Sequence, residues 1–366
     1  MKLINVETNE AGQRLDKLLI KILNKAPKSF IYKMLRKKNI VLNGKKADGS
    51  EKLMVQDEIK MFLSEETIEQ FSEIFSTTEV EHNLNILYED QHILILDKPL
   101  GMLSQKAEIG DISIVEHIIS YMLSTNQITK EQLNSFKPGV CNRLDRNTSG
   151  IMIAGKSLLG LQEMARLLKD RSLEKYYLCI VKGRIDRKKR IEGYLNKDED
   201  RNKVKISKLQ TEDTEYICTE YEPLLQSEYH ADTSKDMTRD SIVKASKSRD
   251  DAISKLTSQE EAIEQAEDGP QGNYTLLQVK LITGRSHQIR AHLASINHPL
   301  IGDFKYGDQR TNHYFKKNFG LTHQLLHSYK MKFPVIEGEL SYLSGKEFQA
   351  ELPELFEQIK KDVFER

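Results

Sequence analysis

Residues 143–150 are the segment that most constrains the fold of this 366-residue chain. They place the carboxylate of Asp145 between two guanidinium groups and lead into an apolar run, residues 151–154, of the type that forms a buried strand. Ser157 follows as a helix cap. The apolar stripe of the predicted helix consists of Leu158, Leu161, Ala165 and Leu168. Asp145 therefore lies on the loop that enters a strand-turn-helix unit, either as a poised nucleophile or within a surface ion cluster, since charge patterns fit both interpretations.

Residues 142–150 resemble the signature His-Arg-Leu-Asp-Arg-x-Thr-Ser-Gly of the ribosomal large-subunit pseudouridine synthases. The sequence departs from this signature at its first position, where Asn142 replaces histidine. The resemblance continues, in the order of the family's motifs, in residues 95–102, 175–181, 283–293 and 298–303. The departure at Asn142 affects local hydrogen bonding rather than the chemistry, because the family's nucleophile is the aspartate.

The resemblance implies an isomerase that acts on RNA without a cofactor. Such an enzyme breaks the carbon–nitrogen glycosidic bond of uridine, turns the base and rejoins it through carbon 5, with the nucleotide drawn out of its stack. Asp145 would be the nucleophile, adding to the ribose or to carbon 6 of uracil, and Arg290 the cation that keeps it ionised. Tyr177 would stack on the base, and Arg143 would displace the target nucleotide. The alternatives are a core tyrosine at Tyr177 and a phosphate contact at Arg143.

Residues 277–296 predict a strand, a turn and a helix. The strand alternates apolar residues up to Leu281, and the helix buries Ile289, Leu293 and Ile296. This arrangement leaves His287 and Arg290 on another face near the helix start, where the positive helix end favours a carboxylate or a phosphate and Arg285 stands beside it. The histidines His287, His292 and His298 do not have the spacing of a metal site, so we expect structural roles for them and no metal.

The amino-terminal segment, residues 1–63, is basic. It holds 14 Lys and Arg against 7 Asp and Glu, although the whole chain has a formal net charge of zero. Two amphipathic helices are predicted, around residues 15–23 and from about Ser29, followed by a strand that ends in a tight turn at Asn43-Gly44. The cations predicted to contact RNA phosphates are Lys28, Lys33, Arg36, Lys37 and Lys38. A solvated helix face is the alternative.

Residues 14–17 and 27–32, with Asn43-Gly44, resemble the S-four-type RNA-binding domain. We therefore expect such a domain over residues 1–63, a polar, acidic linker over residues 64–82, and the catalytic domain over residues 83–366. Residues 226–272 hold 11 Asp and Glu against 6 Lys and Arg and few large apolar side chains. They are predicted to be a disordered insertion, with some helix over residues 241–266.

Composition places the chain among cytoplasmic proteins. No apolar run reaches the length of about 18 residues that a membrane helix needs, and the first residues lack a signal-peptide core. The three cysteines, Cys141, Cys179 and Cys218, are an odd set without Cys-x-x-Cys spacing, which favours reduced thiols over disulfides or a zinc ribbon. A monomer is expected.

The sequence thus predicts an α+β fold, a mostly antiparallel mixed sheet with a central cleft, preceded by a small α/β RNA-binding domain. The predicted function is a pseudouridine synthase acting on large-subunit (23S) ribosomal RNA. A synthase acting on transfer RNA and a non-catalytic RNA-binding or ribosome-assembly protein are the alternatives. A glycoside hydrolase is disfavoured, because it needs two carboxylates about 5 to 10 Å apart and only Asp145 has a suitable setting.

Overall fold

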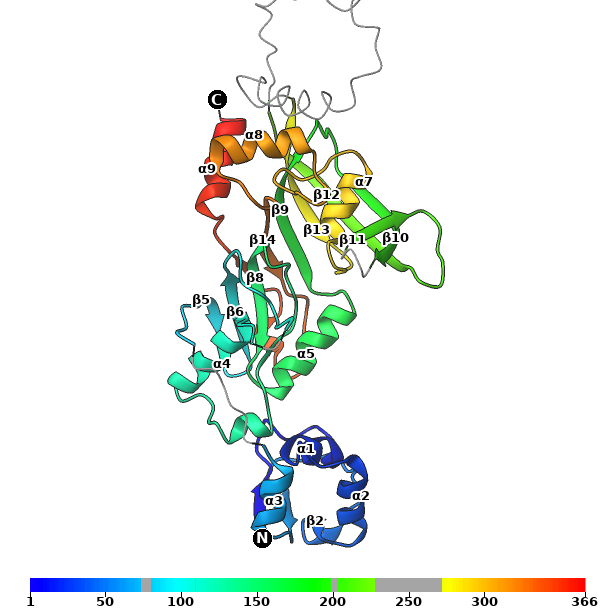
Figure 1. The fold of residues 1–366 in the computed structure, drawn as a ribbon, viewed down its shortest axis with the longest axis vertical. Helices are drawn as coiled ribbons and strands as arrows, with labels where there is room; N and C mark the ends of the chain where they lie inside the picture. Colours follow the sequence, from blue (N-terminus) through cyan, green and yellow to red (C-terminus); the bar gives the residue numbers. More distant parts are fainter. Residues whose placement is uncertain (74–79, 109, 199–202, 228–271, 366) are drawn as a thin grey trace, which may run out of the picture. The chain divides into compact units, whose positions relative to one another are not determined.

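The structure is a computed structural model that describes all residues except 74–79, 109, 199–202, 228–271 and 366. The chain divides into two compact units, each described here by itself (Figure 1). Unit 1 contains Met1–Lys175 and Ser328–Glu351, and unit 2 contains Tyr176–His327 and Leu352–Arg366. Both units combine helices with strands, and antiparallel pairing dominates in both. The predicted α+β class is therefore confirmed.

Unit 1 begins with a small module, residues 1–71, called the N-terminal module below. Its elements are β1 (Lys2–Asn5), α1 (Leu15–Ile22), α2 (Lys28–Arg36), β2 (Ile40–Leu42), β3 (Lys45–Lys46), β4 (Glu58–Met61) and α3 (Glu65–Phe71). The strands are ordered β1-β4-β2-β3. The two predicted helices and the turn are confirmed, since Asn43 and Gly44 have φ angles of 50° and 70° and reverse the chain between β2 and β3.

Helix α3 corrects the predicted linker. Residues 64–71 were assigned to it because they are polar and acidic, but Ser64 caps a helix by accepting a hydrogen bond from Thr67 N. Ile68 is buried in the core of the N-terminal module, and Phe71 packs against the same core, with its ring centroid 4.4 Å from that of Phe30. The module therefore extends to Phe71, because two apolar side chains suffice to dock a short acidic helix.

The rest of unit 1 surrounds strand β8. Its elements are β5 (Asn85–Glu89), β6 (Ile93–Lys98), α4 (Ile114–Ser124), the 3-10 turn Gln132–Asn134, β7 (Gly139–Val140), β8 (Ser149–Gly155), α5 (Leu158–Lys169), β14 (Leu326–Lys332), the 3-10 turn Ser341–Leu343 and β15 (Glu347–Gln349). The strand order is β14-β8-β6-β5, with β7 paired to β8 and β15 to β14. Every residue of β8 is buried. Its apolar sequence follows from packing on both faces.

Helix α5 begins where the sequence predicts it, but buries a different face. Ser157 caps it by accepting a hydrogen bond from Gly160 N at 3.0 Å. The buried residues are Gly160, Met164 and Leu167, whereas Ala165 of the predicted stripe is exposed. A Cβ at position 160 would overlap the backbone of His92. The helix is oriented so that Gly160 faces the backbone of His92. A count of apolar residues does not detect this backbone contact.

Unit 2 contains strands ordered β11-β10-β12-β13-β9. Its elements are β9 (Glu174–Lys182, which starts at the end of unit 1), β10 (Lys189–Asp198), β11 (Lys203–Ser207), β12 (Glu215–Gln226), β13 (Tyr274–Leu281), α7 (Gln288–Ser295), α8 (Gln309–Phe319) and α9 (Glu354–Phe364). Helix α7 packs on β11 and β12 (Figure 1). Leu195, Val204, Ile217 and Ala291 form the small core between them.

Most of the predicted insertion lies outside the described residues. The undescribed residues are 228–271. The prediction of some helix over residues 241–266 falls within them. At the insertion's near edge, Gln226 is the last residue of β12, and Tyr274 N donates a hydrogen bond to the Ser227 hydroxyl at 2.7 Å. The strands on both sides of the insertion are therefore joined at its base.

No helix in the described part of the chain is long and apolar enough to cross a membrane. The three cysteines are free thiols, with Cys179 and Cys218 buried and Cys141 partly buried. Burial raises the pKa of the Cys141 thiol to about 12 and raises the pKa of Cys179 further. The pKa of Cys218 is also raised, mainly by burial. Their raised pKa values hold the three thiols in the protonated form.

Candidate active site

The loop that carries Asp145 is fixed by its neighbours on both sides. The Ser104 hydroxyl accepts a hydrogen bond from Leu144 N at 3.0 Å and donates one to the Leu144 carbonyl at 2.6 Å. Thr148 N donates to the Asp145 carbonyl at 3.0 Å, which closes a turn. The Asp145 side chain is partly exposed at this turn. A carboxylate held by a rigid backbone and open to solvent suits a nucleophile better than a mobile ion cluster.

Lys98 reinforces the same loop and was assigned no role from the sequence. It is fully buried at the end of β6 and donates hydrogen bonds to the carbonyls of Pro99, Met102 and Arg146 at 2.8, 3.0 and 3.2 Å. Burial lowers the pKa of Lys98 to about 8, against the opposing charges of Asp145 and Asp97. Lys98 is therefore a cation that interacts with Asp145 within unit 1. Lys98 and Pro99 lie within residues 95–102, a segment of the resemblance, but the sequence alone does not indicate that Lys98 contacts the Asp145 loop.

The remaining signature residues hold β8 in register. Asn142 accepts a hydrogen bond from Ile153 N at 2.8 Å through its side-chain oxygen, so the asparagine that replaces histidine anchors this strand. Gly150 has a φ of 112°, and a Cβ there would overlap the backbone of Ser328 in β14. Glycine is required at this position because two backbones meet there.

The two arginines beside Asp145 both lie on the surface. Arg146 donates from Nε to the Gly101 carbonyl at 3.0 Å, and Gly101 N donates to the Arg146 carbonyl at the same distance. Arg143 is exposed. Arg146 thus joins two loops, while Arg143 keeps the accessible position that an RNA contact requires.

Tyr177 and Arg290 belong to unit 2 and lie on different elements. Tyr177 is on β9, opposite Val279 of β13, and is 5% exposed. Arg290 is on α7 and is 8% exposed. Each residue from Gln288 to Leu293 is buried, so the helix face that carries Arg290 is buried as well. Because its charge is buried, Arg290 needs a buried partner.

That partner is Asp303. Arg290 donates from Nε to Oδ2 at 2.7 Å and from a terminal nitrogen to Oδ1 at 2.9 Å, a two-point pairing. Burial alone would raise the pKa of Asp303, but the hydrogen bonds and charge of Arg290, with the backbone amides of Lys305 and Tyr306, lower the pKa overall. Asp303 is the last residue of a motif already noted in the sequence, yet its pairing could not be read from a separation of 13 residues.

Tyr306 is a second residue that the sequence did not indicate. The Arg290 guanidinium lies 5.3 Å from the centroid of its ring, a cation–π contact. Its hydroxyl accepts a hydrogen bond from Val204 N of β11 at 2.9 Å and lies 3.1 Å from His287 Nδ1. Tyr306 therefore links Arg290, the start of α7 and the β11 edge.

The histidines have the structural roles expected of them. His292 Nδ1 lies 3.0 Å from the Thr219 hydroxyl, and His298 Nδ1 lies 3.0 Å from the Lys182 carbonyl. His287 occupies the left-handed region at the start of α7, with a φ of 55°. Within the described residues, no group of three or more His, Cys, Asp or Glu side chains could hold a metal ion.

His292 makes unit 2 sensitive to acid. Burial lowers its pKa to about 4 from an ordinary value of 6.5, against a hydrogen bond to the Glu192 backbone. Between these pH values the unfolded chain binds a proton that the folded chain does not, so stability present above pH 6.5 is lost as the pH falls through 4. We expect a loss of about 3 kcal/mol. Urea unfolding between pH 7 and pH 4 measures this loss, and His292→Gln should reduce the slope of the unfolding free energy against pH. The exposed His313→Gln is the matched control, and equal slopes in the wild type and His292→Gln would contradict this account.

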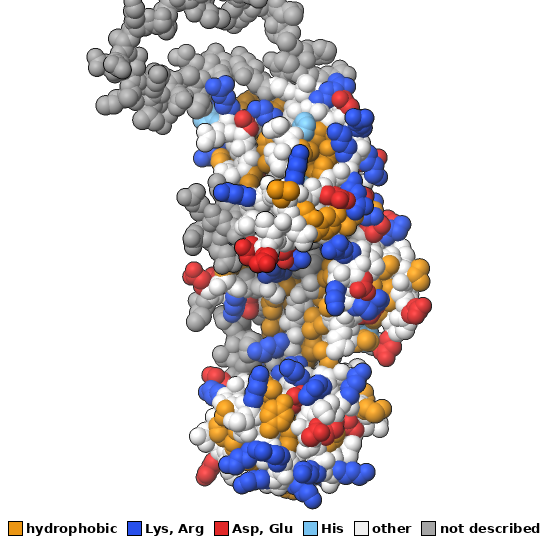
Figure 2. All heavy atoms as spheres, turned by 90° about the vertical axis from the view of Figure 1, so that its right-hand side faces the viewer, with side chains coloured by type: hydrophobic (Ala, Val, Ile, Leu, Met, Phe, Trp, Pro, Cys, Tyr) orange, Lys and Arg blue, Asp and Glu red, His pale blue; other side chains and the backbone are white. Residues whose placement is uncertain are grey.

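The predicted RNA contacts of the N-terminal module form an exposed set. Lys28, Lys33, Arg36, Lys37 and Lys38 are all exposed on α2 and the turn after it. Figure 2 shows Lys and Arg side chains spread over this module. In unit 2, Arg285 is exposed and forms an ion pair with Glu215 at 2.8 Å. The basic surface on α2 has the accessibility that phosphate binding needs, whereas Arg285 would have to exchange its acidic partner for a phosphate.

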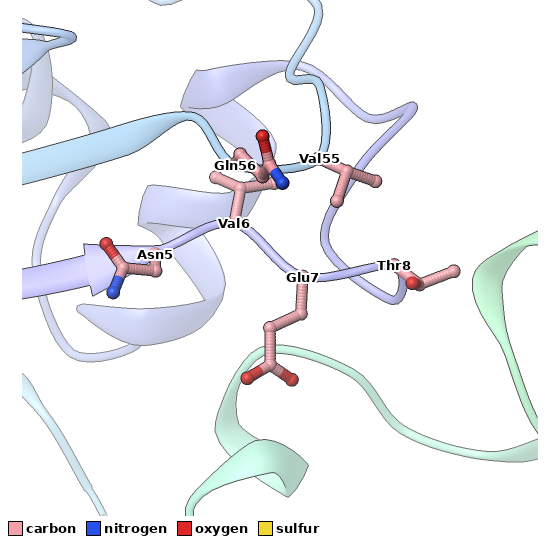
Figure 3. Close-up of a pocket in the computed structure, with 6 residues that line it drawn as sticks. All are labelled: Asn5, Val6, Glu7, Thr8, Val55 and Gln56. Atoms are coloured by element: carbon pink, nitrogen blue, oxygen red, sulfur yellow. The ribbon is translucent and has the colours of Figure 1, made fainter.

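A pocket on the N-terminal module offers no comparable chemistry. Its lining residues are Asn5, Val6, Glu7, Thr8, Val55 and Gln56 (Figure 3). Its volume is about 580 Å³. The only charge in this lining is the carboxylate of Glu7, which repels a phosphate. This lining therefore contains no cation that could pair with an RNA phosphate.

A match to the RNA pseudouridylate synthase family spans residues 92–295. This segment includes Asp145, Tyr177 and Arg290. The chain belongs to this family. It is therefore an RNA pseudouridine synthase, an isomerase, and the non-catalytic alternative is set aside.

Relatives of this synthase cover nearly its full length. It is 27% identical to an uncharacterized RNA pseudouridine synthase of Mycoplasma genitalium over 97% of both chains. It is 25% identical to the ribosomal large subunit pseudouridine synthase C of Vibrio cholerae, over 91% of this chain and 89% of the relative. It is 29% identical to the ribosomal large subunit pseudouridine synthase D of Borreliella burgdorferi, over 86% of this chain and 78% of the relative. The shared length extends well beyond the family match.

The fold of the synthase is also found among solved structures. Human RNA pseudouridylate synthase domain containing 4 matches with a TM-score of 0.52 and 17% identity, over 76% of this chain and 92% of that one. This likeness supports the fold assignment alone.

Proposed function

We propose that this enzyme converts uridines of large-subunit ribosomal RNA to pseudouridine. The observation that carries the proposal is its similarity to synthases named for the ribosomal large subunit, over 91% and 86% of its length. The basic surface of α2 supports an extended RNA substrate, because phosphate contacts outside the reacting nucleotide add affinity and fix position.

In the proposed reaction, Asp145 is the nucleophile. The bond between the ribose and uracil N1 breaks, the base turns, carbon 5 bonds to the ribose and loses its proton, and N1 gains one. The atoms balance without an oxidant, a reductant or a cofactor. The rigid backbone around Asp145 supports this role, because a nucleophile must keep its position while the base turns.

The other roles are assigned by residue type and setting. Tyr177 stacks on the target base, and its buried place in β9 supports a fixed ring. Arg290 is the cation of the reaction, held by Asp303 and Tyr306. Arg143 takes the position of the displaced nucleotide in the RNA, which its exposure allows. Lys98 is added as a positioning residue that holds the loop of Asp145.

Tritium release tests the proposal. Unmodified transcripts of 23S ribosomal RNA and of transfer RNAs, each labelled with tritium at carbon 5 of uridine, are incubated with the enzyme. Release from the ribosomal transcript is expected, because carbon 5 exchanges its hydrogen for the ribose bond. Release from the transfer RNAs alone would overturn the choice of substrate.

The α2 surface gives a prediction on salt dependence. Replacing Lys33, Arg36 and Lys37 together with Ala should reduce the slope of log affinity against log salt by about 2 to 3, since each phosphate contact contributes about 0.7 to 0.9. Their exposure means that folding should be unaffected. Filter binding of the ribosomal transcript at several salt concentrations measures the slope. Lys2→Ala, an exposed lysine on β1, is the control, and an unchanged slope in the triple variant would show that α2 makes no phosphate contacts.

A further inference from the structure

We propose that Phe304 is a stacking platform for an unpaired base of the RNA substrate. The inference rests on the proposed function, since it requires an RNA ligand. Phe304 is 57% exposed, although Asp303 before it is fully buried. The exposed large hydrophobic side chains in the described part of unit 2 are Leu209, Leu224, Leu225 and Phe304. Phe304 is therefore the one aromatic ring among them.

The turn that carries Phe304 is rigid. Asp303 accepts hydrogen bonds at its side chain from Lys305 N at 2.9 Å and Tyr306 N at 3.1 Å, and its carbonyl accepts from Gly307 N at 2.7 Å. The buried Asn312 of α8 donates to the same carbonyl at 2.9 Å. A flexible loop would let an apolar ring fold back onto the protein, but this backbone holds Phe304 outward.

Two glycines bound the turn and allow it to approach other backbone groups closely. A Cβ at Gly302 would overlap the backbone of His323, and a Cβ at Gly307 would overlap that of Asp303. The Asn312 side-chain oxygen also accepts a hydrogen bond from Gly302 N at 2.8 Å. Close backbone contacts therefore hold the turn at both ends, and the exposed Phe304 lies between them.

The setting of Phe304 matches a nucleobase better than a protein surface. A protein-docking patch requires a contiguous apolar area, whereas the residues that follow Phe304 in the sequence include Lys305 and Arg310, which is exposed at the start of α8. An exposed aromatic ring and cations on one short segment are a combination that binds single-stranded RNA, the ring stacking on a base and the cations pairing with phosphates. Bases within a duplex already stack on each other, so the partner is an unpaired base.

The same turn carries the groups that hold Arg290. Asp303 pairs with Arg290, and the Tyr306 ring faces its guanidinium. A base stacked on Phe304 would therefore attach the RNA to the element that positions this proposed catalytic cation. The effect expected of Phe304 is on substrate binding, with the chemical step left intact.

Fluorescence gives a direct test because the chain contains no tryptophan. Phe304→Trp places a single indole on the turn, and Leu209→Trp places one at another exposed position of unit 2, where leucine is 75% exposed. Single-stranded oligouridylate should quench the emission of the Phe304→Trp enzyme, and a duplex of the same oligouridylate with oligoadenylate should not. The Leu209→Trp enzyme should respond to neither. Equal quenching in both variants, or none at position 304, would overturn the proposal.

Kinetics with the ribosomal transcript distinguish base stacking on an aromatic ring from a nonspecific apolar contact. Phe304→Ala should raise KM by about 5- to 150-fold with kcat unchanged, from about 1 to 3 kcal/mol per stacked base. Phe304→Leu should behave like the Ala variant, and Phe304→Trp should restore the wild-type KM. A Leu variant equal to the wild type would overturn the proposal. If the wild type releases no tritium, the proposed function fails, while the fluorescence experiment still decides the role of Phe304.

Discussion

Asp145→Asn is expected to reduce tritium release from ribosomal RNA by at least about 10⁴-fold, the scale seen when a nucleophile is removed. The amide has the shape of the carboxylate but cannot add to the ribose or to the base. RNA affinity should be unchanged, because the phosphate contacts proposed for α2 do not involve this side chain. Single-turnover tritium release and filter binding measure the two quantities on the same protein.

A matched control separates chemistry from folding. Asp170, at the end of α5, is an exposed aspartate of the same unit. Asp170→Asn makes the same chemical change there and should leave turnover unchanged. Ser104 and Lys98 hold the Asp145 loop through backbone groups, so the variant should keep the backbone of the loop. Any shift in its unfolding midpoint would report the lost interaction of Asp145 with the buried Lys98. Retained turnover in Asp145→Asn would refute its role as nucleophile.

Asp303→Asn is expected to lower the free energy of unfolding by about 3 to 5 kcal/mol, because it leaves the buried charge of Arg290 uncompensated. The amide oxygen can still accept the hydrogen bonds of Lys305 N and Tyr306 N, whereas the amide nitrogen cannot accept the hydrogen bond from Arg290 Nε, so the effect combines the lost charge with one lost hydrogen bond. Urea unfolding measures the change. If Arg290 is the cation of the reaction, kcat should fall further than the loss of folded protein explains.

An exposed ion pair provides the comparison for this second variant. Arg166 and Glu163 lie 2.6 Å apart on α5, with the arginine side chain 50% exposed. Glu163→Gln should cost no more than about 1 kcal/mol, since solvent screens the pair. A similar small cost for Asp303→Asn would mean that Arg290 is stabilised mainly by other contacts, including the ring of Tyr306.

The features predicted correctly from the sequence are those set by neighbouring residues. The Ser157 cap, the Asn43-Gly44 turn and strand β8 each depend on a few adjacent side chains, and all are present. The loop position of Asp145 follows from the same local pattern. Their local origin explains why a single sequence was sufficient.

The errors concern contacts between distant segments. The buried face of α5 is set by Gly160 against the backbone of His92, and an apolar stripe cannot report such a contact. The burial of residues 288–293 of α7 comes with its packing on β11 and β12, and the Arg290–Asp303 pair joins a helix to a later turn. Periodicity describes one element at a time, so it does not detect a helix whose first six residues are all buried.

The native thiols also determine how the protein can be labelled. With their pKa values raised by burial, Cys141, Cys179 and Cys218 present almost no thiolate at neutral pH. A cysteine introduced on the exposed face of α2 would react with alkylating reagents far faster than the three native residues. Photo-crosslinkers or fluorophores can therefore be attached at one chosen position on the unaltered background, and the RNA nucleotides that approach this helix can be mapped directly.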